Sequence, residues 1–288
     1  MKRLICILLI LFSLCGCVRQ KKQQIIATTL PVYTFTQRLC EDTGITVGQL
    51  VTENVSCLHD YTLKVDQMQM LEQAEAVVIS GAGLEDFLQD ALHSANVKID
   101  ASQGLTLLEG SHDEHEHHGE HSHAEDPHIW LSPKNASVMA KNICNGLCSL
   151  YPAHAKTIEH NLVTLLSELD ALQKYGEEAL MELKSRDLIT FHDGFSYLAE
   201  SFDLTILKAV EEESGSEASA KQLISLISLV REHNLPAIFT ETNGSVSAAG
   251  IVADEAGIPI FALNTGISGE DYFDVMYYNI DTLQEALS

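Results

Sequence analysis

Basic residues are scarce in this sequence. Its 288 residues include 17 Lys and Arg against 41 Asp and Glu, and the formal net charge is −24. Nucleic-acid binding depends on clustered Lys and Arg that neutralise phosphates, so the composition argues against a nucleic-acid-binding protein. A strongly acidic surface keeps a protein soluble and concentrates cations nearby.

A membrane-spanning segment is also missing from the start of the chain. Residues 1–3 are basic and residues 4–14 are apolar, but this run falls short of the roughly 20 residues that cross a bilayer as a helix. A basic start followed by a short apolar run is typical of an export signal that is removed from the mature protein. We therefore expect a signal peptide over residues 1–16.

The residues that follow the apolar run, Leu14-Cys15-Gly16-Cys17, resemble the lipobox of bacterial lipoproteins. The resemblance implies that Cys17 becomes the lipidated first residue of the mature protein. Residues 17–23 would then be a polar tether to the membrane. The alternative is an ordinary cleaved signal with a chance cysteine. In the lipoprotein interpretation the protein lies on the extracytoplasmic face of a bacterial membrane.

Short apolar runs alternate with helical patterns along the rest of the chain. Helical patterns include residues 62–73 and 84–95. Such alternation indicates two α/β units with mostly parallel sheets flanked by helices. The expected strands are residues 24–30, 45–51, 76–80, 97–100, 187–191, 204–210, 237–240 and 259–263.

A long helical pattern lies between the two halves, from about residue 153 to residue 183. Roughly 30 helical residues form a rod of about 45 Å, which would overshoot a single small domain. We therefore expect an N-terminal lobe over residues 24–152 and a C-terminal lobe over residues 186–288, joined by a rigid linker helix over residues 153–185. Apolar residues recur on one face of this helix at i, i+3 and i+4 spacing, namely Ile158, Leu162, Leu165, Leu166, Leu169 and Leu172.

Residues 111–125 contain no apolar residue larger than alanine. Such a segment cannot bury itself, so a mobile surface loop is predicted. A solvated charged segment is the simpler alternative, but acidic residues alone would serve that purpose. Neutral imidazole binds zinc, copper and nickel, which favours a weak metal-gathering role. The histidines of this loop are His112, His115, His117, His118, His121 and His123.

Polar residues lie at or beyond the carboxyl ends of several expected strands, where parallel sheets form ligand sites. His59, His192, Glu241 and Asn264 have this placement, and His128 lies beside the only Trp, directly after the histidine-rich loop. Three imidazoles with one further donor fit zinc at bond lengths of about 2.0–2.1 Å. The expected ligands are therefore His59, His128 and His192.

Several motifs resemble the cluster A-I substrate-binding proteins of metal-importing ABC transporters, which bind zinc or manganese. The resemblance covers nearly the whole mature chain. It implies two similar lobes with a long rigid helix between them, and a metal bound between the lobes by His59, His128 and His192. A histidine-rich loop before the Asp-Pro-His motif is similar to the zinc-binding members. The motifs are residues 56–61, 81–85, 126–133, 191–195, 238–241 and 272–276 with Asn279.

The sequence departs from this family at two positions. Leu58 replaces the proline that usually precedes the first ligand histidine, and Asn264 occupies the place of the usual fourth ligand, an aspartate. The fourth donor is therefore expected to be a water molecule or a weak oxygen ligand. Among the protein candidates, Glu241 is favoured over Asn264.

The sequence as a whole predicts a monomeric, lipid-anchored solute-binding protein that captures zinc and delivers it to the permease and ATPase of an ABC importer. The alternatives are a manganese- or iron-binding member of the same family, an adhesin or metal store without a transporter, and a zinc-dependent hydrolase with Glu241 as the base. No H-E-x-x-H or nucleophile motif is present, so we expect no enzyme.

Overall fold

The computed structural model describes residues 23–53, 55, 58, 61–92, 96–110, 125–210, 219–269 and 271–288. The expected signal peptide, Cys17, His59 and the six loop histidines lie outside these residues. Within the described part of the chain, no helix combines the length and the apolar character needed to cross a membrane.

The first lobe is built on a parallel sheet with the strand order β2-β1-β3-β4. The central strand β3 is buried along its whole length, as expected for a parallel sheet that is covered by helices on both faces. The strands are β1 (Ile25–Ala27), β2 (Val47–Gln49), β3 (Ala76–Ile79) and β4 (Lys98–Asp100).

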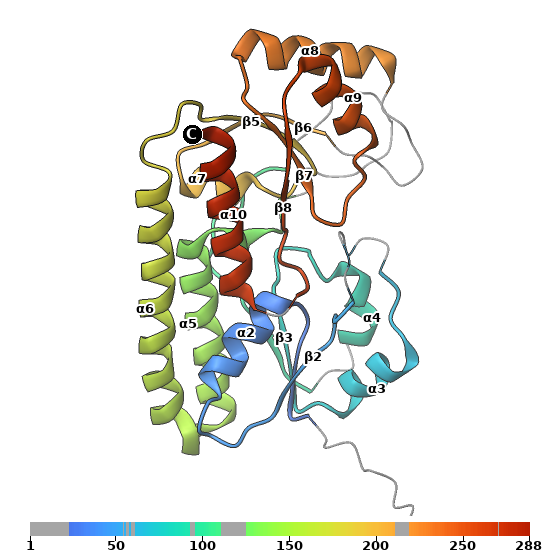
Figure 1. Ribbon diagram of the computed structural model, residues 1–288. Coiled ribbons are helices and arrows are strands. Elements are labelled where there is room, and N and C mark those ends of the chain that lie inside the picture. Colours follow the sequence, from blue (N-terminus) through green and yellow to red (C-terminus); the bar gives the residue numbers. More distant parts are fainter. Residues whose placement is uncertain are drawn as a thin grey trace, which may run out of the picture.

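The second lobe has the matching arrangement β6-β5-β7-β8, again with all strands parallel. Its strands are β5 (Asp187–Phe191), β6 (Thr205–Ala209), β7 (Ile238–Glu241) and β8 (Ile260–Leu263). The predicted two-lobed α/β fold is therefore confirmed, and Figure 1 shows the two sheets one above the other.

Helices flank both sheets (Figure 1). The first lobe carries α2 (Leu30–Leu39), α3 (Val65–Gln73), α4 (Gln89–Leu92) and α5 (Pro133–Leu150), and the second carries α7 (Ser196–Ser201), α8 (Ala220–His233) and α9 (Ser247–Ala256). The remaining long helices are α6 (Ala155–Ala179) and α10 (Tyr272–Leu287). Short 3₁₀ turns precede α4, α5 and α6 at Asp86–Leu88, Ile129–Leu131 and Pro152–His154.

The helix between the lobes is shorter than the predicted 153–185. A 3₁₀ turn precedes α6, and α6 ends at Ala179. Beyond that end, the guanidinium of Arg186 donates to the carbonyls of Leu180 and Met181, so a side chain from the following segment satisfies groups that further helix would have paired. In Figure 1, α6 runs beside α5 and leads through a loop into β5.

One hydrophobic cluster extends across both lobes, and each lobe has a smaller cluster of its own. A single cluster of buried side chains includes Phe35 of α2 and Tyr272 of α10, and their rings meet edge to face with centroids 4.8 Å apart. The backbone N–H of Leu30 donates to the carbonyl of Ile267 across the lobes at 2.9 Å. Helix α10 therefore packs on the first lobe although it follows the last strand of the second.

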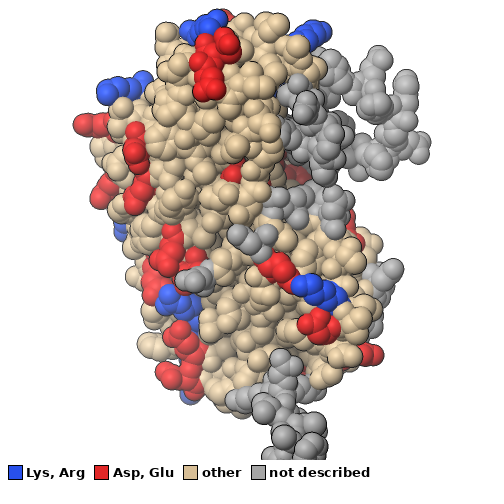
Figure 2. Space-filling model, turned by 45° about the vertical axis from the view of Figure 1, so that its right-hand side comes forward, with Lys and Arg blue, Asp and Glu red and all other residues tan. Residues whose placement is uncertain are grey.

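Charged side chains are scattered over the surface. On the face shown in Figure 2, the Lys and Arg side chains of the described residues are few and mostly lie beside acidic ones.

Candidate metal centre

Two of the expected ligands meet between the sheets. His192 directly follows β5, and His128 begins the 3₁₀ turn that leads into α5. Their imidazole rings lie edge to face at 88°, with centroids 5.3 Å apart. His128 is buried, with 7% of its surface exposed. The structure thus brings together two imidazoles that stand 64 positions apart in the sequence.

A carboxylate fixes the orientation of His128. Asp126 Oδ1 accepts the backbone N–H of His128 at 2.9 Å and lies 2.8 Å from its ring Nδ1. Since both residues are buried, the carboxylate favours a proton on Nδ1. The Nε2 lone pair is then available for a metal ion. Sequence analysis missed this role, although an acid two residues before a candidate ligand was a visible signal.

The segment that carries His128 is attached to the second lobe. Trp130 Nε1 donates to the carbonyl of Thr265 at 2.7 Å, and the Tyr272 hydroxyl donates to the carbonyl of Trp130 at 2.8 Å. The Tyr197 hydroxyl donates to the carbonyl of Asp126 at 3.1 Å. Trp130 is fully buried. The ring of His128 therefore sits on a rigid segment.

A glycine makes room for the two imidazoles. A Cβ atom added to Gly194 would lie 2.6 Å from His192 Nε2 and 3.0 Å from His128 Cε1. Both distances are shorter than ordinary van der Waals contact. The missing side chain at this position therefore allows the rings of His128 and His192 to approach each other.

Glu241 lies at the end of β7 and faces His192. Its Oε2 is 3.8 Å from His192 Nδ1, and its Oε1 accepts the hydroxyl of Thr265 at 3.1 Å. Burial raises the pKa of Glu241 to about 7, although the Thr265 hydroxyl and His128 both act to lower it. A buried carboxyl that titrates near neutrality can lose its proton to solvent when a cation binds.

Asn264 directly follows β8, but its side chain is engaged in a turn. Its Oδ1 accepts the backbone N–H of Gly266 at 2.8 Å. The side-chain amide of Asn279 binds both the backbone N–H and the carbonyl of Asn264, each at 2.8 Å. Of the two protein candidates for the fourth donor, Glu241 lies beside His192, whereas Asn264 closes a turn.

His59, the remaining expected ligand, lies outside the described residues, so its place relative to the other two stays a prediction. Its neighbour Leu58 is buried. The backbone N–H of Val55 donates to Ser268 Oγ at 3.4 Å, which ties this part of the first lobe to the loop after Asn264. In the portion of the chain that is described, no group of three or more His, Cys, Asp and Glu side chains is arranged to hold a metal ion.

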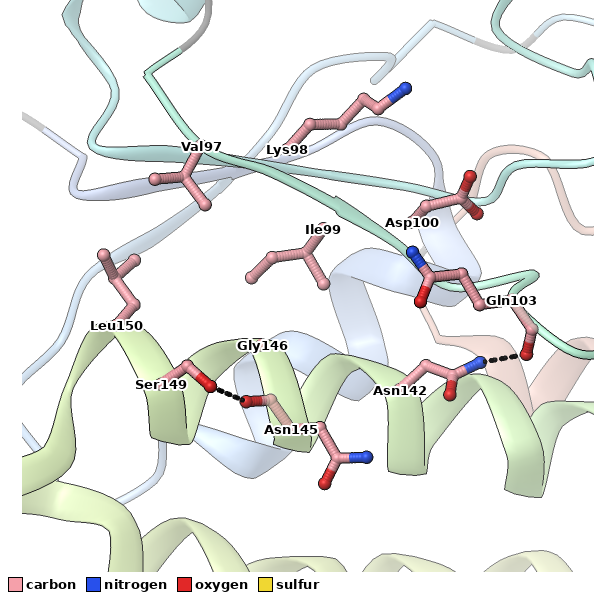
Figure 3. A pocket seen from close by; sticks show the side chains of 10 residues that line it. All are labelled: Val97, Lys98, Ile99, Asp100, Gln103, Asn142, Asn145, Gly146, Ser149 and Leu150. Carbon is pink, nitrogen blue, oxygen red and sulfur yellow. Dashed lines mark hydrogen bonds between the residues drawn. The ribbon is translucent and has the colours of Figure 1, made fainter.

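A separate pocket of about 430 Å³ lies between β4 and α5 (Figure 3). Asn142 closes one end by donating to the carbonyl of Gln103 at 2.8 Å. The helix approaches the strand closely at Gly146, where an added Cβ would lie 2.8 Å from Ile99. His128, His192, Glu241 and Asn264 are not among the described residues that line this pocket.

Comparison with known proteins finds relatives that are described as zinc-uptake or zinc-binding proteins. Residues 25–286 match the family described as "Zinc-uptake complex component A periplasmic". The chain is 30% identical over 282 residues to the high-affinity zinc uptake system protein ZnuA of Bacillus subtilis, a match that covers 92% of this chain and 88% of the relative. It is 31% identical over 302 residues to the zinc-binding lipoprotein AdcA of Streptococcus pneumoniae, covering 96% of this chain but only 60% of AdcA.

Solved structures agree with this result. A crystal structure of ZnuA superposes with a TM-score of 0.80 at 31% identity, over 92% of this chain and 99% of that one. Zinc(II)-bound AdcA from Streptococcus pneumoniae gives a TM-score of 0.77 at 28% identity, over 92% of this chain and 58% of AdcA.

Proposed function

This chain belongs to the family of periplasmic zinc-uptake component A proteins, and we propose that it holds zinc through His59, His128, His192 and Glu241. It is a solute-binding protein that captures zinc for import, as the sequence predicted. Zinc is the transported cargo in this function. The donors and their arrangement are the part that we propose.

The observation that carries the proposal is the meeting of His128 and His192 from the two lobes, with their rings 5.3 Å apart. Asp126 Oδ1 lies beside Nδ1 of His128, and Glu241 Oε2 lies beside Nδ1 of His192. In a tetrahedral zinc site with bonds of about 2.0–2.1 Å, neighbouring donor atoms lie roughly 3.3 Å apart. Because Glu241 Oε2 and His192 Nδ1 are 3.8 Å apart, a small side-chain movement would place both atoms at bonding distance.

The choice of Glu241 over Asn264 follows from charge and from hydrogen bonding. A carboxylate neutralises part of the metal's charge, whereas the Asn264 amide is neutral and already accepts the Gly266 N–H. Three imidazoles favour zinc, and manganese prefers sites rich in oxygen. One carboxylate among three imidazoles keeps that preference for zinc.

Titration of the purified mature protein with zinc and with manganese, in competition with a chromophoric chelator, tests the site. We expect one tight zinc equivalent and much weaker manganese binding. His128→Ala, His192→Ala and Glu241→Gln should each weaken zinc binding. His233→Ala is the matched control, because His233 pairs with Asp187 at the surface. Equal affinity for the two metals would contradict the proposal.

We also propose that Cys17 carries a lipid anchor, which would place the protein on the extracytoplasmic face of the membrane. Stable anchoring takes two or more hydrophobic signals, so native protein should partition into detergent. Cys17→Ala should yield unprocessed or released protein. A processed Cys17→Ala protein that still fractionates with membranes would refute the anchor.

The proposed partners are the permease and ATPase of an ABC importer, with the chain acting as a monomer. The six loop histidines are proposed to gather metal weakly. Deletion of residues 112–123 should remove weak zinc equivalents and leave the tight one nearly intact. Loss of the tight equivalent on deletion would make a loop histidine a primary ligand.

A further inference from the structure

The turn formed by Asn264, Thr265 and Gly266 is held firmly by the second lobe. Asn264 Oδ1 accepts the Gly266 N–H, and the fully buried Asn279 binds both backbone groups of Asn264. Gly266 has a φ of 70°, a left-handed conformation that glycine adopts without strain. The backbone of Thr265 is therefore fixed on both sides.

A side chain of the first lobe also forms a hydrogen bond with this turn. Trp130 Nε1 donates to the backbone carbonyl of Thr265 at 2.7 Å. Trp130 is two residues beyond His128 and is fully buried. Thr265 thus lies where the segment that carries His128 meets the second lobe.

The Thr265 hydroxyl binds the carboxylate that lies beside His192. It donates to Glu241 Oε1 at 3.1 Å, and both side chains are buried, with 2% and 4% of their surfaces exposed. The other oxygen, Oε2, is the atom that faces His192 Nδ1. The last torsion angle of a glutamate side chain, which rotates the carboxylate, has a broad distribution with little intrinsic preference. A fixed donor on one oxygen therefore determines where the other oxygen points.

We propose that Thr265 is a positioning residue that orients the Glu241 carboxylate and presents its Oε2 to the zinc cargo. The inference rests on the proposed role of Glu241 as a metal donor. It also gives Asn264 a function in this chain, since the amide at the family's usual ligand position closes the turn that holds Thr265. Because Trp130 binds the backbone carbonyl of the same residue, Thr265 also links the Glu241 carboxylate to the segment that carries His128.

The test compares Thr265→Val with Thr265→Ser. Valine keeps the branched shape and the backbone carbonyl that binds Trp130, but it lacks the hydroxyl. Substitution of an outer partner of a metal ligand typically weakens metal binding about 10–100-fold, and we expect Thr265→Val to fall at the lower end. Thr265→Ser should bind zinc close to wild type. The d–d absorption spectrum of the Co²⁺-substituted protein should change in Thr265→Val and not in Thr265→Ser.

The double variant Thr265→Val/Glu241→Gln shows whether Thr265 acts through Glu241. If it does, the double variant should bind zinc as weakly as Glu241→Gln alone and no more weakly, because contacting residues of one network are not additive. Additive losses would overturn the inference. Thr265→Ala replaces Thr265→Val throughout if the valine variant does not fold.

The remaining outcomes separate the two proposals. If Glu241→Gln binds zinc as wild type does, the role of Glu241 is wrong and the Thr265 inference falls with it. If Glu241→Gln weakens binding while Thr265→Val keeps wild-type affinity and an unchanged Co²⁺ spectrum, only the Thr265 inference is overturned.

Discussion

Substitution of Asp126 by Asn should weaken zinc binding without moving the ligand backbone. Asparagine has the same shape and can still accept the His128 Nδ1–H through its amide oxygen, but it carries no charge. The imidazole then becomes a less basic donor. Loss of such an outer partner typically costs about 10–100-fold in metal affinity. This corresponds to about 1.4–2.7 kcal/mol of binding free energy.

The same substitution should also lower the free energy of unfolding. Asp126 Oδ2 is buried and has no hydrogen-bond partner among the described residues, so the new NH₂ group would find no acceptor there. A buried donor left unpaired costs about 1–3 kcal/mol. Urea unfolding of the metal-free protein measures this cost separately from the zinc affinity.

Asp187→Asn is the matched control for Asp126→Asn. Asp187 Oδ2 lies 2.9 Å from His233 Nδ1, which is the same kind of pair at a partly exposed position. Chelator competition should give Asp187→Asn the affinity of wild type. The reasoning is refuted if Asp126→Asn binds zinc as tightly as Asp187→Asn does.

Tyr272→Phe should lower the free energy of unfolding by about 1–3 kcal/mol, because it leaves the buried carbonyl of Trp130 without its donor. Tyr175→Phe, which loses an exposed hydrogen bond, should have a smaller effect in the same urea titration. Burial raises the pKa of Glu85 from 4.5 to about 7, so the folded state holds this proton more tightly. The free energy of unfolding of metal-free protein should therefore fall between about pH 4.5 and pH 7, and Glu85→Gln should flatten that fall. Asn264→Asp adds a charged oxygen near the site and should narrow the preference for zinc over manganese in parallel titrations; an unchanged ratio would exclude this position from the metal's surroundings.

The strands could be predicted because parallel strands are buried on both faces and appear as continuous apolar runs. The run at residues 76–80 is of this kind, and β3 occupies 76–79. Helix α6 was predicted too long, because the helical pattern continues past Ala179 while the chain turns toward β5. The Arg186 side chain satisfies the carbonyls of Leu180 and Met181 there, and a side-chain cap of this kind is not part of a periodic apolar pattern.

The site was predictable where topology places residues together. His192 follows β5 and Glu241 ends the neighbouring parallel strand β7, and the carboxyl ends of neighbouring parallel strands lie at one edge of the sheet. Thr265 could not be found in this way, because its role depends on a hydroxyl–carboxylate contact and on a bond to Trp130, which is 135 residues away in the sequence. Contacts of this kind are visible only once both lobes are assembled.

The packing of α10 on α2 has a consequence for how the protein matures. Phe35 has its ring partner at Tyr272, and Leu287 accepts a hydrogen bond from Lys184. Without α10 the apolar face of α2 that carries Phe35 would lack this cover, so the first lobe completes its core only when the C-terminal helix is in place. Folding that must wait for such distant contacts is slow. Cutting the chain at α6 would therefore leave the first lobe with an open apolar face, although every strand of its sheet lies before the cut.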